Sequence, residues 1–169
     1  MALINLTGIQ PTEFEVLADD ASPSEGATVA VPLARLLEAE EAFFKSAGSV
    51  GAIIDTETSY DALAAVADKI AFAVIDFPAF GDGRGFSLAV RLRKDYAFKG
   101  EIRAVGPVIP DQALFLLRAG FDTVDAADER KAAFEAALER FPAFYQTDFG
   151  GQVSVAHTRH SAEGQRKAS

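Results

Sequence analysis

One pattern repeats along most of this chain: a short apolar run with β-branched residues, a turn signal, and an amphipathic stretch of helical length. The apolar runs begin about 20 to 30 residues apart, which is the length of one strand–helix unit. The predicted strands cover residues 28–33, 50–55, 72–77, 102–105 and, more weakly, 123–124. Such a repeat predicts parallel strands joined by helical crossovers.

The predicted helices cover residues 34–46, 59–69, 86–96, 112–119 and 128–141. The strands around residues 52–54 and 72–75 are apolar without polar alternation, as in central parallel strands that helices cover on both faces. The predicted fold class is therefore α/β, with an open, mainly parallel sheet and helices on both faces, flavodoxin-like or Rossmann-like. A half-barrel is the alternative, because the sequence does not fix strand order. The predicted core includes Ile53, Ile54, Val74, Ile75, Leu88, Leu92, Leu114 and Leu117.

Composition changes divide the 169 residues into three parts. Residues 1–26 form an N-terminal segment that ends in an acidic, turn-rich loop, and residues 27–145 form the α/β domain. Residues 146–169 replace the apolar pattern with glycine, glutamine, serine and basic residues, which predicts a flexible C-terminal tail.

Charge and residue usage exclude several function classes. With 25 acidic and 16 basic side chains the net charge is −9, which repels phosphate backbones, so no nucleic-acid partner is expected. The chain has no cysteine, so a cysteine nucleophile and a thiolate metal site are excluded, and we expect no metal site. No apolar run approaches membrane-spanning length and the start lacks a basic secretion signal, so we expect a cytoplasmic protein without a membrane contact.

The loops after the predicted strands hold the candidate ligand-binding residues, because function in parallel α/β domains gathers at the carboxyl edge of the sheet. In the loop of residues 76–87, alternating glycines permit positive φ and close backbone approach just before a helix whose free N–H groups favour an anion. The candidates are Asp82, Gly83, Arg84, Gly85 and Ser87 from this loop, and Arg103, Asp111, Gln112, Arg118 and Asp122 farther along. In the alternative interpretation, the glycines form a simple turn and the arginines pair with nearby aspartates. No catalytic set of nucleophile, base and orienting residue is visible, and the sequence assigns no cofactor.

Several short motifs occur in order between residues 77 and 122. They are Phe77-Pro78-Ala79-Phe80, Asp82-Gly83-Arg84-Gly85-Phe86-Ser87, Leu92-Arg93, Gly100-Glu101-Ile102-Arg103-Ala104-Val105-Gly106, Asp111-Gln112 and Arg118-Ala119-Gly120-Phe121-Asp122. Together these motifs resemble the uncharacterised bacterial family called domain of unknown function 934. The chain departs from the family pattern at Gly81, where a threonine is common, and this removes a hydroxyl from the loop.

The resemblance implies a role in sulfur assimilation, because members are usually encoded beside assimilatory sulfite reductase and phosphoadenylyl-sulfate reductase. It brings neither a reaction nor a catalytic residue, although members are sometimes labelled oxidoreductases. The expected function is an accessory protein of assimilatory sulfate and sulfite reduction in cysteine biosynthesis, with sulfite reductase or its electron donor as partner. The alternative is a small oxidoreductase or other enzyme that binds an anionic sulfur metabolite or a nucleotide.

Overall fold

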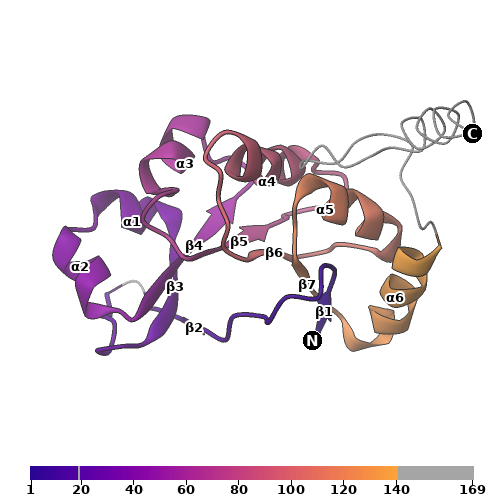
Figure 1. Cartoon of the computed structure of the whole chain (residues 1–169), viewed down its shortest axis with the longest axis horizontal. Helices are drawn as coiled ribbons and strands as arrows, with labels where there is room; N and C mark the ends of the chain where they lie inside the picture. The colour runs from indigo at the N-terminus through magenta and orange to yellow at the C-terminus, as the bar shows by residue number, and fades with distance from the viewer. Residues whose placement is uncertain (19, 141–169) are drawn as a thin grey trace, which may run out of the picture.

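A computed structural model of the chain describes residues 1–18 and 20–140 (Figure 1). Its strands are β1 (Ala2–Asn5), β2 (Glu15–Val16), β3 (Thr28–Pro32), β4 (Ser49–Asp55), β5 (Phe72–Asp76), β6 (Ile102–Val105) and β7 (Thr123–Ala126). Its α-helices are α1 (Leu33–Glu38), α2 (Glu41–Ser46), α3 (Tyr60–Val66), α4 (Arg84–Lys94), α5 (Ala113–Ala119) and α6 (Lys131–Glu139). Two 3₁₀ turns, η1 (Pro110–Gln112) and η2 (Asp128–Arg130), precede α5 and α6.

The strands form one sheet in the order β1-β7-β6-β5-β4-β3-β2. Strands β2 to β7 are parallel and follow one another in chain order, whereas β1 pairs antiparallel with β7 at one edge. The α/β class and the open, mainly parallel sheet are thus confirmed, and β5 and β4 are central as predicted. The strand order is that of the half-barrel alternative.

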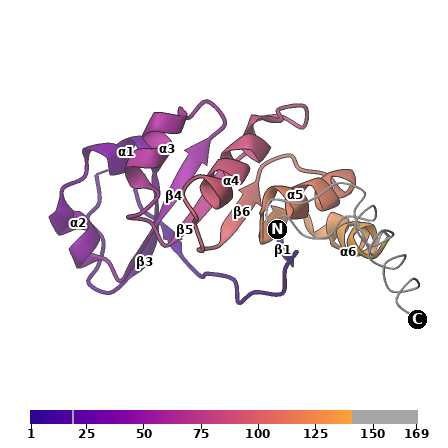
Figure 2. The ribbon, with the colours of Figure 1, turned by 45° about the horizontal axis from the view of Figure 1, so that its top comes forward.

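The helices cover one face of this sheet, because strands in chain order with right-handed crossovers send every helix to the same side. Helices α1, α3, α4, α5 and α6 contact one another in series (Figures 1 and 2). Helices on both faces would require the strand order to reverse, and here it does not. The main core lies between this row of helices and the sheet.

The predicted core residues are mostly buried, and the exceptions lie on β4 and α5. Five of them are buried: Ile54, Val74, Ile75, Leu88 and Leu92. Ile53, Leu114 and Leu117 are half-buried, and α5 instead directs Ala113 and Leu116 into the core.

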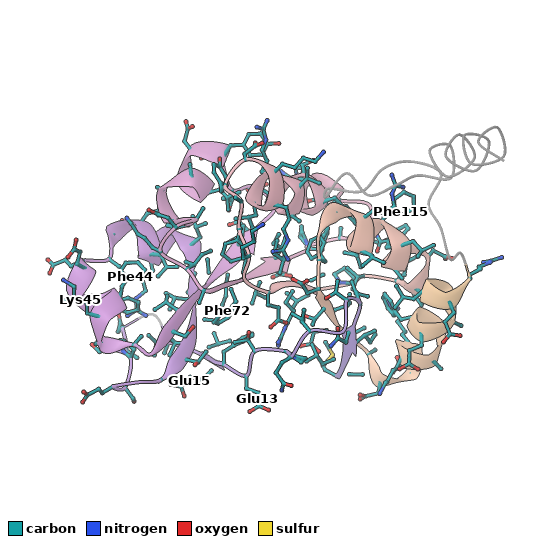
Figure 3. All side chains as sticks on the ribbon, viewed as in Figure 1. Glu13, Glu15, Phe44, Lys45, Phe72 and Phe115 are labelled. Atoms are coloured by element: carbon teal, nitrogen blue, oxygen red, sulfur yellow. The ribbon has the colours of Figure 1, made fainter. Side chains whose placement is uncertain are left out.

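The first residues of the chain cover the other face of the sheet. Residues 6–14, which we call the N-terminal strap, connect β1 at one edge to β2 at the other and run along the side opposite α3, α4 and α5 (Figures 1 and 2). Phe14 of the strap stacks on Phe72 of β5 with ring centroids 4.9 Å apart. Figure 3 shows Phe72 on this side of the sheet. The segment that the sequence analysis separated from the α/β domain therefore contributes both outer strands of its sheet. The end of the domain predicted at residue 145 and the predicted tail lie outside the described residues.

Helix boundaries differ from the predictions where local geometry is unusual. The predicted helix 34–46 is divided into α1 and α2, because Ala39 and Glu40 between them have extended backbone. Ser59 caps α3, since its hydroxyl accepts a hydrogen bond from Ala62 N at 3.2 Å. Asp111 does not cap the next helix: the Gln112 side chain accepts from Ile109 N at 3.1 Å instead.

Candidate functional site

Asp82 anchors the loop that follows β5. Its Oδ1 accepts hydrogen bonds from the backbone N and the Nε of Arg84, both at 3.0 Å. Its Oδ2 accepts from Arg84 Nη2 at 2.8 Å and from Thr56 Oγ1 at 2.6 Å. Thr56 directly follows β4 and is only 3% exposed. Asp82 therefore ties the loop after β5 to the loop after β4, and both loops lie at the carboxyl edge of the sheet.

These contacts favour the ionised forms of both Asp82 and Arg84. Hydrogen bonds from Arg84, and then from Thr56, hold the pKa of the Asp82 carboxyl well below its usual range. Arg84 has its pKa raised, chiefly by Asp82, and its Nη1 also lies 3.7 Å from an oxygen of Glu57. The guanidinium, whose side chain is 55% exposed, thus faces two carboxylates. For Arg84 the salt-bridge interpretation describes the structure.

The glycines of this loop do not have the conformation that the sequence analysis expected. None of Gly81, Gly83 and Gly85 has positive φ. A Cβ at Gly81 or Gly83 would meet nothing within 4 Å, whereas one at Gly85 would lie 2.6 Å from the Phe77 ring. Gly85 is therefore required for packing. The edge glycine that needs its conformational freedom is Gly106, with φ of 99°.

Two open cavities adjoin the loop. The first, about 360 Å³, is lined by Thr56, Glu57, Thr58, Ser59, Tyr60, Arg84, Ser87 and Leu88. The second, about 430 Å³, shares Tyr60 and Ser87 with it and extends along α4 to Arg91 and Asp95. The Arg91 guanidinium lies 4.4 Å from the centre of the Tyr60 ring and pairs with Asp95. Of the predicted residues, Arg84 and Ser87 line this groove.

The η1 turn joins the same edge through Gln112. Its Nε2 donates to the backbone oxygen of Phe80 at 3.2 Å, which connects the turn to the loop after β5. Asp111 lies exposed beside it in η1. These two predicted residues thus lie at the same edge of the sheet as the loop after β5.

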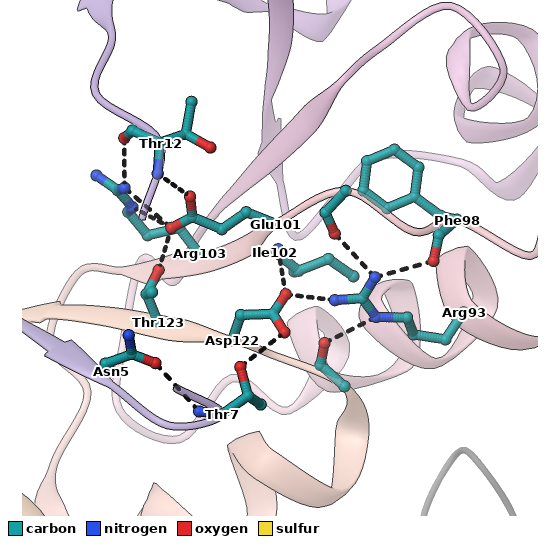
Figure 4. A network of polar contacts seen from close by, with 12 residues as sticks. Asn5, Thr7, Thr12, Arg93, Phe98, Glu101, Ile102, Arg103, Asp122 and Thr123 are labelled. Carbon is teal, nitrogen blue, oxygen red and sulfur yellow. Dashed lines mark hydrogen bonds and ion pairs between the residues drawn. The ribbon is translucent and has the colours of Figure 1, made fainter. Parts of the chain in front are cut away.

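Arg103 lies elsewhere, on the face of β6 that the N-terminal strap covers (Figure 4). Its Nε donates to Glu101 Oε1 at 3.0 Å, and its Nη2 donates to Thr12 O at 2.8 Å. Glu101 also accepts hydrogen bonds from Thr12 N, at 2.6 Å, and from the Thr123 hydroxyl. Burial opposes ionisation of Glu101, but the bonds from Thr123, Thr12 and Arg103 outweigh it and lower its pKa. Arg103 holds the strap to the sheet.

Asp122 precedes β7 and lies at the amino edge, opposite the candidate site. It accepts hydrogen bonds from Ile102 N at 2.9 Å, from Thr7 Oγ1 at 3.1 Å and from Arg93 Nη2 (Figure 4). Arg93 also donates to the backbone oxygens of Phe98, Gly100 and Gly120. Arg118 lies in the last turn of α5, also toward the amino edge. The expected convergence of Arg103 and Arg118 with the loop after β5 is therefore wrong, as is the placement of Asp122 at the carboxyl edge.

Residues that the sequence analysis left out give the carboxyl edge its charge. Asp55 and Asp76 end the two central strands and are register partners. Asp55 Oδ1 accepts from Glu57 N at 2.9 Å and from Thr58 Oγ1 at 3.1 Å. The available signal was an acid at the end of each of the two most apolar strands. Asp82 and Glu57 face Arg84, and Asp55 and Asp76 add negative charge to the same edge of the sheet.

Chemically, this edge suits a cation or a cationic side chain better than an anion. Within residues 1–18 and 20–140, no group of three or more His, Asp or Glu side chains is placed to hold a metal ion. None of the helices described combines the length and apolar character needed to cross a membrane.

A family profile described as "Bacterial protein of unknown function (DUF934)" matches residues 51–156. The chain belongs to the DUF934 family. The match begins inside β4, so β1 to β3 and the N-terminal strap precede it. A search of curated proteins finds no match to the chain.

The motifs that carried the DUF934 resemblance occupy two separate places. The motif around Asp82 and Arg84 forms the loop at the carboxyl edge. Those containing Arg93, Glu101, Arg103 and Asp122 form the polar network of Figure 4, which joins the strap and β6 to β7. Many of the motif residues therefore hold the fold together by hydrogen bonds and ion pairs.

Proposed function

We propose that this DUF934 chain is an accessory protein of assimilatory sulfate and sulfite reduction in cysteine biosynthesis. It acts by binding a protein partner, sulfite reductase or its electron donor, rather than by turning over a sulfur metabolite. The pathway comes from the family resemblance. The mode of action is supported by one observation: the arginine of the glycine-rich loop is paired with Asp82 and faces Glu57.

This pairing disfavours a sulfur oxyanion as ligand. Sulfite and adenylyl sulfate are anions, and an anion site needs guanidinium or N–H donors free to turn toward it. At this edge Asp82 uses the Nε, the Nη2 and the backbone N–H of Arg84. An entering anion would have to displace Asp82 and would then face Glu57.

The same charges favour a protein contact. Complementary charge accelerates association and selects partners, even where it adds little affinity. A chain with a net charge of −9 and an acidic edge suits a basic surface on a larger protein.

Deletion of the gene in a bacterium that carries a single copy tests the proposal. Growth should fail or slow on sulfate and on sulfite and should be normal on sulfide and on cysteine, because the proposed step lies before sulfide. The wild-type gene supplied in trans should restore growth. Normal growth of the deletion strain on sulfate would contradict the sulfur assignment.

The alternative, an enzyme that binds an anionic sulfur metabolite or a nucleotide, is favoured by the many hydroxyls in the 360 Å³ cavity beside Arg84. Calorimetric titration of the purified chain with sulfite, adenylyl sulfate and NADPH separates the two functions. Saturable binding that is lost in Arg84→Ala, while the variant stays folded, would support the enzyme. Absence of binding together with co-purification of sulfite reductase would support the accessory role.

A further inference from the structure

A third cavity lies at the ends of β3, β4 and β5. It has a volume of about 310 Å³ and combines an apolar wall with acidic side chains. Pro32, Leu33, Leu37 and Ile53 contribute to the wall, and Asp55 and Asp76 contribute the carboxylates. None of the candidate ligand-binding residues predicted from the sequence lines it.

The two carboxylates are close together without a structural reason. Asp55 and Asp76 are register partners on neighbouring strands, so their side chains leave the sheet on the same face. Like charges directly opposite each other destabilise a sheet. Asp55 receives local hydrogen bonds, but the carboxylate of Asp76 takes part in no hydrogen bond or ion pair with the described residues. A local rule broken without compensation marks a candidate functional position.

The apolar wall of the cavity also contains a side chain that is not packed into the core. Leu37 of α1 is 45% exposed, although its neighbours Leu33 and Leu36 are buried. An exposed leucine alone is ordinary. Here it borders the cavity that contains the carboxylates of Asp55 and Asp76, so an apolar surface and a negative charge are presented side by side.

We propose that this cavity is the docking site for a lysine or arginine side chain from a basic segment of the protein partner. The aliphatic stem lies against Leu37 and Ile53, and the cationic head lies between the carboxylates of Asp55 and Asp76. The inference rests on the proposed function, to which it adds the chemistry of the partner and the place where it binds.

Charge complementarity selects this occupant. A purely apolar side chain would bury the carboxylates without a counter-charge, which is costly. A nucleic acid or another anion would be repelled by Asp55, Asp76 and the neighbouring Glu57. A basic side chain with a long methylene stem packs its stem against the apolar wall and pairs its charge with the carboxylates.

The test uses the full ¹⁵N-labelled chain and two peptides, Gly-Leu-Lys-Leu-Gly and its analogue with norleucine in place of lysine, in about 150 mM salt. The lysine peptide should shift amide signals at the ends of β3, β4 and β5, saturably, and bind about five times more tightly than the norleucine peptide. The variant Asp55→Asn/Asp76→Asn should lose about fivefold in affinity for the lysine peptide. Amide spectra also report whether each variant is folded.

The matched control is Glu129→Gln/Glu139→Gln, which removes the same charge from exposed positions around α6. It should leave the affinity within about twofold. Equal losses of peptide affinity in both double variants, or amide shifts scattered over the surface, would mean that the peptide is attracted by overall charge. Either result would overturn the proposal. Equal binding of both peptides would overturn it as well.

Other occupants give different results, each of which contradicts a partner's basic segment. If a second copy fills the cavity, sedimentation should show a dimer that Asp55→Asn/Asp76→Asn dissociates. If the chain's own basic residues fill it, Arg166→Gln/Lys167→Gln should shift the same amides without added peptide. A negative peptide result alongside a growth defect on sulfate would remove this inference and leave the proposed function standing.

Discussion

At Gly106 the chain turns away from β6 and passes directly against the end of β5. A Cβ at this position would lie 2.2 Å from the backbone oxygen of Phe77, and φ is 99°. Gly106→Ala should therefore destabilise the fold by about 2 kcal/mol, because both the conformation and the contact oppose a side chain. Urea denaturation followed by circular dichroism measures this loss.

Gly81→Ala provides the control, since a Cβ there meets nothing within 4 Å and φ is not positive. It should change the free energy of unfolding by less than about 0.5 kcal/mol. Similar losses in both variants would show that the close approach at Gly106 is not the cause.

Glu101 is the buried acid of the strap network, and its charge is stabilised by Thr12, Arg103 and Thr123. Glu101→Gln should destabilise the fold by about 3 kcal/mol at neutral pH, because Arg103 is left buried without its counter-charge. The folded-state pKa of Glu101 is lowered, so its contribution is complete above the unfolded-state pKa and is lost as the pH falls through the folded-state value.

The difference in urea midpoint between wild type and Glu101→Gln should therefore shrink as the pH is lowered from 7 to about 3. Glu129→Gln, at an exposed position, should show no comparable trend. A difference that stayed constant over this range would mean that Glu101 acts through packing rather than charge.

At the scale of elements, the strap depends on one aromatic contact as well as on its polar network. Phe14→Ala removes the stacking on Phe72 and should cost about 2 kcal/mol, less than a fully buried phenylalanine because Phe14 is half-buried. Thermal unfolding measures the loss. Phe115→Ala is the matched control: Phe115 is 60% exposed on α5 (Figure 3) and should be nearly neutral. Equal shifts in melting temperature would contradict a structural role of the strap.

The parallel strands from β3 to β7 were predictable within two residues at each end, because each is a short apolar run followed by a turn signal. The strands β1 and β2 were not predicted: they are four and two residues long, and their pairing partners lie far from them or across a loop. The pairing of Ala2 with Ala126 leaves no local trace in either segment. Short strands defined by tertiary pairing escape a search based on periodicity.

The candidate site was predictable only where strand position was taken into account. Asp82 and Arg84 follow a strand and do lie at the carboxyl edge. Asp122 precedes β7, so it lies at the amino edge. Arg103 lies within β6, where alternation with the buried Ile102 and Ala104 directs it to the opposite face. Whether each residue precedes a predicted strand, lies within it or follows it could be read from the sequence.

For the whole molecule, the net charge of −9 and the acidic carboxyl edge imply that like-charge repulsion limits stability. Asp76→Asn should raise the free energy of unfolding by about 0.5 kcal/mol by relieving repulsion with Asp55, and by more at low ionic strength. Urea unfolding at two salt concentrations measures the effect. Asp20→Asn, in an exposed loop, should show a smaller change. A loss of stability in Asp76→Asn would mean that its carboxylate supports the fold.

The position of the first sixteen residues has a consequence for biosynthesis. They supply both outer strands, yet Ala2 pairs with Ala126, so β1 cannot be seated until β7 has left the ribosome. Before β1 pairs with it, the newly made β7 has an open edge. The pairing of Glu15 with Val29 needs only the next strand and can form early. The nascent chain therefore begins its sheet at one edge and completes it at the other, using a single N-terminal segment for both events.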